Sequence, residues 1–130
     1  MRNIIEVLEE FEGLLIWTEQ IGDRLYFLYW IDIQTSANGN VNYYARVLTT
    51  PNEISLLKRG VVDIRDIFRG KQITVENENG ENVNWKIDRI FWRNYIPLPD
   101  IYLAGIVDPL NTSCLTPTVI KKKDWIKEGF

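Results

Sequence analysis

The chain has 130 residues, of which 45% are hydrophobic and 25% are charged, and its formal net charge is −3. These values are typical of one soluble globular domain, and we expect residues 1–130 to fold as a single unit. Histidine is absent and Cys114 is the only cysteine, which excludes Ser-His-Asp and Cys-His catalysis, an intrachain disulfide and an ordinary zinc site.

The first segment, residues 1–11, has apolar residues at helical spacing, with glutamates on the opposite side. These apolar residues are Ile4, Ile5, Leu8 and Phe11. Asn3 and Glu6 stand where an N-cap and its capping-box partner belong. We therefore predict a short N-terminal helix that ends at Gly13, with a strand as the alternative for so short a segment.

Three antiparallel strands are predicted next, over residues 14–20, 24–34 and 41–48. The second and third strands are joined by a loop with Asn38-Gly39, a pair that favours a hairpin. Residues 25–31 are too apolar for a strand with one face in water. This run indicates a central strand that is covered on both faces, or one that uses a face for association.

Two short helices follow this meander. Thr50 has the pattern of an N-cap, Pro51 fits the first helical position, and Glu53 completes a capping box. Gly60 is placed to end this helix.

Asp63 begins the second helix and has Asp66 three residues later. We expect Ile64, Ile67 and Phe68 to pack inward, and Gly70 to end the helix.

The C-terminal half is predicted to add a strand over residues 71–76, a hairpin turn at Asn79-Gly80 and a half-buried strand over residues 83–90. Residues 100–108 are predicted as one more strand. The expected fold class is therefore α+β. It consists of an antiparallel, aromatic-rich sheet, made of a three-stranded meander and a second hairpin, with two short helices between the strand groups.

The sequence pattern of residues 46–68 resembles that of a small uncharacterised bacterial domain family. The matching features are the strand end RVLTT, then E-I-x-x-L-x-x-G at residues 53–60, then VDIRDIF at residues 62–68. The resemblance covers about residues 13–70. The family has no assigned activity, so the resemblance implies no catalytic residues. Small domains of this kind occur among bacterial defence and mobile-element genes, so the resemblance implies a role in such conflicts.

Catalytic and cofactor motifs are absent from the sequence. There is no glycine-rich phosphate loop, and Cys114 has no histidine to act as its base, so it is interpreted as a buried or incidental thiol. Asp63 and Asp66 are candidates for a magnesium site, but helix capping explains them better. We expect no cofactor, no metal and no enzymatic activity, with a carboxylate-only enzyme as the remaining alternative.

Partner contacts are expected from two sets of residues: basic residues near the helix ends and aromatic residues in the strands, although packing in the core is the simpler interpretation of the aromatics. The candidates are Arg65, Arg69, Lys71, Tyr29, Trp30 and Trp92. The acidic net charge disfavours nucleic acid, even with Lys121–Lys123 and Trp125 near the C-terminus.

The sequence therefore predicts a non-enzymatic protein-interaction module, binding a partner protein or a second copy of the chain. An accessory, immunity or inhibitor role in bacterial defence or phage conflict is the expected setting. A small-anion or nucleotide-sensing domain is the alternative. The chain has no secretory signal pattern and no apolar run near the ~20 residues of a membrane span, so we expect a cytoplasmic protein.

Overall fold

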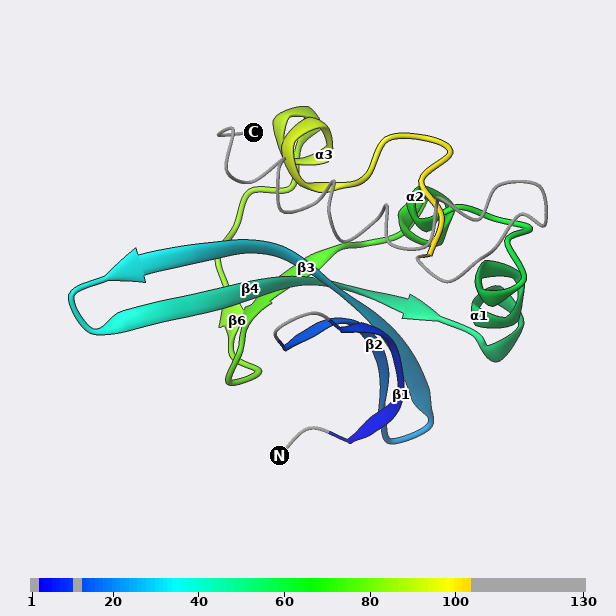
Figure 1. Ribbon diagram of the computed structural model, residues 1–130, viewed down its shortest axis with the longest axis horizontal. Helices are drawn as coiled ribbons and strands as arrows, with labels where there is room; N and C mark the ends of the chain where they lie inside the picture. The colour runs from blue at the N-terminus through cyan, green and yellow to red at the C-terminus, as the bar shows by residue number, and fades with distance from the viewer. Residues whose placement is uncertain (1–2, 11–12, 104–130) are drawn as a thin grey trace.

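A computed structural model describes residues 3–10 and 13–103 of the chain. Six strands form one antiparallel sheet in which each strand lies beside the strand that precedes it in the sequence (Figure 1). The strands are β1 (Ile4–Glu10), β2 (Leu14–Ile21), β3 (Arg24–Ser36), β4 (Gly39–Thr49), β5 (Thr74–Asn77) and β6 (Asn82–Val83). The helices are α1 (Pro51–Lys58), α2 (Ile64–Phe68) and α3 (Arg89–Tyr95). The predicted α+β class is confirmed.

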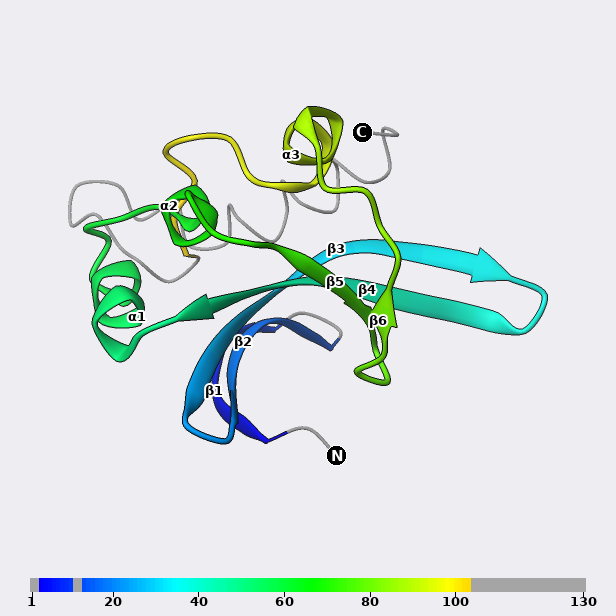
Figure 2. The same cartoon turned by 180° about the vertical axis from the view of Figure 1, so that it is seen from behind.

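The three helices lie on one side of the sheet, and the β1–β2 and β5–β6 hairpins bend away to the other side (Figures 1 and 2). Phe68 of α2 anchors the helical layer. Its ring centroid lies 5.6 Å from that of Phe27 and 5.8 Å from that of Tyr29, and all three side chains are fully buried. The side of the sheet that carries Phe27 and Tyr29 is therefore the helix-covered face.

The structure contains the turns and the helix cap that the sequence predicts. Gly39 and Gly80 have φ angles of 111° and 83°, a region that favours glycine, and each lies at the end of a predicted hairpin turn. The Thr50 side chain accepts a hydrogen bond from the backbone N–H of Glu53 at 3.1 Å, and Gly60 follows α1 with a φ of 74°.

Asp63 and Asp66 form a complete capping box at the start of α2. The Asp63 carboxylate accepts the Asp66 N–H at 2.8 Å, and the Asp66 carboxylate accepts the Asp63 N–H at 3.2 Å. The capping interpretation of these two acids is therefore confirmed. As predicted, Ile64, Ile67 and Phe68 are the buried residues of this helix.

The predicted N-terminal helix is wrong, because residues 4–10 form strand β1 against β2. The strand pairing has register shifts between Ile4 and Glu6 and between Val7 and Glu9. Each shift inserts a residue into the alternation of the strand. The apolar residues consequently recur at three- and four-residue intervals, which imitates the spacing of a helix.

The predicted strand over residues 83–90 is also wrong. Strand β6 ends at Val83, and α3 begins after Asp88, whose carboxylate accepts the Phe91 N–H at 3.0 Å. Of the predicted strand over residues 100–108, residues 101–103 have no strand structure. The remainder lies outside the described residues, as do Cys114, the Lys121–Lys123 run and Trp125.

Candidate functional site

The face of the sheet opposite the helices is concave. Trp17 of β2 and Tyr44 of β4 are separated by strand β3, yet their ring centroids are 4.6 Å apart with planes at 74°. Strands that are not neighbours in a flat sheet lie about 9–10 Å apart. The sheet must therefore curl toward this side, and we call it the concave face.

Strand register determines which side chains reach this face. Trp17 pairs with Leu28, Leu28 with Arg46, and Arg46 with Thr74, so these positions share one side of the sheet. Tyr44 pairs with Glu76 on the same side.

A charged and aromatic cluster occupies the centre of the concave face. Arg46 Nη1 lies 3.0 Å from Glu76 Oε2, and the Arg46 guanidinium carbon lies 4.3 Å from the centroid of the Tyr26 ring. Trp17 Nε1 donates to Glu19 Oε2 at 2.9 Å. We call Trp17, Glu19, Tyr26, Tyr44, Arg46 and Glu76 the concave-face cluster.

Burial makes the Arg46–Glu76 pair energetically important. The Glu76 side chain is 1% exposed, and that of Arg46 is 21% exposed. Removing one member of a buried ion pair leaves an uncompensated charge, which typically costs about 3–5 kcal/mol. Arg46 Nε is buried and has no hydrogen-bond partner within the described part of the chain.

Two hollows flank the cluster, and Arg46 lines both of them. The first has a volume of about 830 Å³ and lies where β4 continues past the end of its pairing with β5. We call it the fork hollow, and its lining includes Arg24, Tyr26, Arg46, Glu53 and Lys71. The second, of about 650 Å³, lies between the ends of β1 and β2 and the β5–β6 turn, and its charged lining includes Glu19, Glu76 and Glu78.

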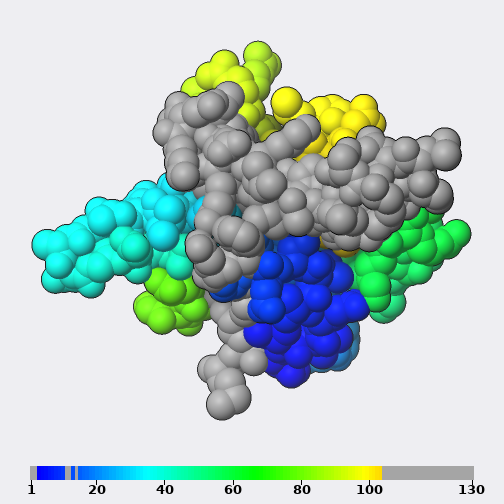
Figure 3. Space-filling model, in the orientation of Figure 1, coloured from blue at the N-terminus to red at the C-terminus, as the bar shows by residue number. Residues whose placement is uncertain are grey.

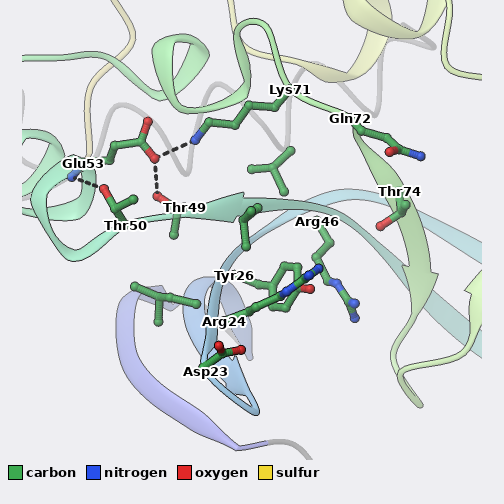
Figure 4. A pocket seen from close by; sticks show the side chains of 13 residues that line it. Asp23, Arg24, Tyr26, Arg46, Thr49, Thr50, Glu53, Lys71, Gln72 and Thr74 are labelled. Atoms are coloured by element: carbon green, nitrogen blue, oxygen red, sulfur yellow. Dashed lines mark hydrogen bonds and ion pairs between the residues drawn. The ribbon is translucent and has the colours of Figure 1, made fainter.

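The fork hollow has both charge signs. Lys71 Nζ lies 2.6 Å from Glu53 Oε1, which also accepts a hydrogen bond from Thr49 Oγ1 at 2.9 Å. Figure 4 shows this group at one end of the hollow, with Arg24, Tyr26 and Arg46 at the other. Partial burial acts to raise the pKa of Glu53, but the hydrogen bonds from Lys71 and Thr49 outweigh it, and the pKa is lowered below 4.5.

Exposed apolar side chains surround the cluster on the same face. Register places Ile4 beside Glu19, Val7 beside Trp17, and Leu48 beside Tyr26, and Ile21 lies two residues beyond Glu19. These four side chains, which we call the apolar rim, are between 37% and 48% exposed. The concave face therefore combines a charged centre with apolar surface that water still reaches.

Two of the predicted partner-binding residues lie in the core instead. Tyr29 is 1% exposed beneath α2, and Trp30 is 6% exposed with its Nε1 donating to Asn42 Oδ1 at 3.1 Å. Burial and the neighbouring charge of Glu9 raise the pKa of Tyr29 well above 10. Neither side chain offers a surface to a partner, because both are buried.

Arg65 and Trp92 contact each other rather than forming an open surface. Arg65 Nη1 donates to the Pro97 carbonyl at 3.1 Å, and its guanidinium carbon lies 5.0 Å from the centroid of the Trp92 ring. Both residues therefore hold the segment around α3 against α2. Arg69 is exposed and lies 3.3 Å from Asp66.

Of the six predicted residues, Lys71 alone lines the fork hollow. Sequence reasoning missed Arg24, Tyr26 and Arg46 as members of this site. The sequence did contain one indication of Arg46 as a site residue, since it is the single charged residue in the predicted strand 41–48. Its partner Glu76 is 30 residues away, and only the strand pairing reveals their contact.

Among residues 3–10 and 13–103, no group of three or more His, Cys, Asp or Glu side chains is placed to hold a metal ion. No helix in the described part of the chain is long and apolar enough to cross a membrane.

Models of known protein families, characterised proteins and solved structures include no match to this chain. The family resemblance over residues 13–70 therefore stays a prediction.

Proposed function

We propose that this chain is a non-enzymatic protein-interaction module that binds a partner protein on its concave face. The observation that carries the proposal is the apolar rim, which places exposed apolar side chains around one preformed hollow surface. Apolar side chains gathered on one exposed surface commonly mark interaction sites.

The residue types in the centre of the face agree with this proposal. Tyr and Arg are among the side chains that most often anchor protein interfaces, and Tyr26 and Arg46, which are both partly exposed, lie in contact here. The contacts between Arg46, Tyr26 and Glu76 already fix these side chains in place. A partner would therefore bind a preorganised surface and lose little side-chain entropy on docking.

The biological setting is part of the same proposal. A cytoplasmic accessory, immunity or inhibitor protein in bacterial defence or phage conflict acts by binding another protein, and the resemblance over residues 13–70 supports such a role. The absence of histidine and of a phosphate-binding glycine loop from the sequence supports a binding role over catalysis.

Affinity purification with matched variants tests the proposed function. Leu48→Asp places a charge on the apolar rim, whereas Ile90→Asp places the same charge on α3, where Ile90 is similarly exposed. We expect one protein to co-purify in stoichiometric amount with the unaltered chain and with Ile90→Asp, and to be lost with Leu48→Asp. Equal retention by both variants would contradict binding at the concave face.

A small-anion or nucleotide-binding domain is the second candidate. Arg24, Arg46 and Lys71 come from three separate segments and line the fork hollow together. Its volume of about 830 Å³ falls within the range of ~300–1,000 Å³ typical of small-molecule sites. Glu53 and Asp23 line the same hollow and offset part of the positive charge, which is why we rank this function second.

A thermal-shift panel of inorganic phosphate, nucleoside monophosphates and nucleoside triphosphates tests this candidate. Arg24→Gln removes a cation from the fork hollow, and Arg93→Gln removes one from the exposed surface of α3. A ligand that raises Tm for the unaltered chain and for Arg93→Gln, but not for Arg24→Gln, supports the site. If no member of the panel raises Tm, the proposed anion site is contradicted.

A further inference from the structure

The end of the β3–β4 hairpin extends beyond the rest of the sheet. Strand β2 pairs with β3 only as far as Tyr29, and β5 pairs with β4 only from Tyr43. The outer pairs, from Ile33↔Asn42 to Ser36↔Gly39, have no third strand on either side within the described residues. We call residues 33–42 the arm, and Figures 1 to 3 show it projecting from the body of the molecule.

The arm lacks the usual protection against edge pairing over residues 33–42, because the one register shift of the β3–β4 pairing lies before it, between Trp30 and Asp32. Residues 33–42 read IQTSANGNVN and contain no charged residue and no proline. Natural edge strands commonly carry charges, prolines or bulges that block pairing with another chain. The edge strand β1 has these features, since it carries Glu6, Glu9 and Glu10 and three register shifts.

The two edges of the arm differ in how much backbone they leave available for pairing with another strand. On the β4 side, the backbone N–H and the side-chain amide of Asn42 lie 3.4 and 3.5 Å from the carboxylate oxygens of Glu78. On the β3 side, the Ile33 N–H donates to Asp32 Oδ1 at 2.8 Å, and the strand continues through residues 34–36, well past the end of the β2 pairing at Tyr29. The β3 edge therefore offers the longer open stretch of backbone.

The arm is already ordered for strand addition. Ser36 Oγ donates to the Gly39 carbonyl at 3.2 Å and accepts the Asn38 N–H at 3.2 Å, which fixes the turn. A two-stranded hairpin alone is only marginally stable in water, and additional strands stabilise it.

We propose that the β3 edges of two copies of this chain pair antiparallel through the arm and form an intermolecular four-stranded sheet. A two-fold axis near Gln34 places Asp32, the nearest charged residue, opposite Ser36 of the partner subunit, so no like charges face each other. A charged strand from another protein would find no opposite charge on this edge. A second copy of the chain would bring an equally uncharged edge to it. This inference does not depend on the concave face.

Analytical ultracentrifugation of the full chain over a concentration series tests the proposal. Thr35→Lys places a charge on the β3 edge, and Asn40→Lys places the same charge on its direct cross-strand neighbour in β4. Both native residues are exposed, so both variants are expected to fold, which circular dichroism checks.

The unaltered chain and Asn40→Lys are expected to form a dimer with the same dissociation constant. For Thr35→Lys the constant should rise at least about tenfold, because the two lysines lie diagonally opposed across the axis. An equimolar mixture of Thr35→Lys and Thr35→Glu chains should restore the dimer. A monomer at every concentration, or equal weakening by Thr35→Lys and Asn40→Lys, overturns the proposal.

Discussion

At the scale of single residues, Arg46 connects the features of the concave face. It pairs with Glu76, lies over the ring of Tyr26 and lines both hollows. Strand register holds it there, since Arg46 pairs with Leu28 on one side and Thr74 on the other. A residue with this many contacts is expected to affect stability as well as binding.

Arg46→Met should lower the free energy of unfolding by about 2–3 kcal/mol, because it leaves the Glu76 carboxylate buried without this cation. We expect less than the ~3–5 kcal/mol of a fully buried pair, since Arg46 is partly exposed. Urea unfolding measures the change. The double variant Arg46→Met/Glu76→Gln should recover part of the loss, and a single-variant effect below about 0.5 kcal/mol would show that the pair is not a buried one.

Glu53 should make part of the stability depend on pH. Its folded-state pKa is lowered below 4.5 because the hydrogen bonds from Lys71 and Thr49 outweigh the effect of partial burial. A lowered carboxyl pKa stabilises the fold at pH values above the unfolded pKa, and this contribution is lost as the pH falls through the folded pKa.

We therefore expect Glu53→Gln to destabilise the chain at pH 7 by no more than about 1 kcal/mol, since solvent still reaches part of the group and screens its charge. The difference from the unaltered chain should shrink as the pH falls below 4.5. Thermal unfolding at several pH values measures it. A difference that stays constant from pH 7 down to acid would contradict the role of the Glu53 charge.

At the scale of elements, the sequence correctly predicted the helix caps and turns, which depend on local chemistry. The caps at Thr50 and Asp63 and the turns at Gly39 and Gly80 need only neighbouring residues, and the structure confirms them. Strand β1 was missed because its bulges follow from pairing with β2. Helix α3 was missed because residues 83–90 also alternate like a strand, although Asp88 at its N-cap was a readable signal.

The candidate site was predicted far less well than the fold. Lys71 was among the predicted residues, but the contact of Arg46 with Tyr26 and Glu76 joins three strands and depends on their register. Trp30 and Tyr29 were named as partner candidates, with core packing as the simpler interpretation, because an aromatic strand gives no sign of which of its faces is covered.

Helix α2 provides the element-scale prediction. Asp63 accepts hydrogen bonds from the backbone N–H groups of Asp66 and Asp100, both at 2.8 Å. Asp63→Ala should lower the free energy of unfolding by about 1–2 kcal/mol, because the helix loses its cap. Asp63→Asn keeps an oxygen acceptor and should cost less. Chemical denaturation of both variants measures this order, and equal losses would contradict the capping role.

At the scale of the whole molecule, the two faces of the sheet differ in composition and exposure. The helix-covered face holds the buried packing of Phe27, Tyr29 and Phe68, which stabilises the fold. The concave face keeps a charged cluster and exposed apolar side chains. This division places most of the described aromatic side chains in the core and leaves the apolar rim exposed on the concave face.

Amide hydrogen exchange of the chain, alone and bound to its co-purified partner, tests whether a partner binds the concave face. We predict that binding slows exchange in residues 24–28, 46–49 and 71–74, which include the lining of the fork hollow. Exchange in residues 89–95 of α3, on the opposite side, should be unchanged. Protection confined to α2 and α3, with none on the concave face, would contradict it.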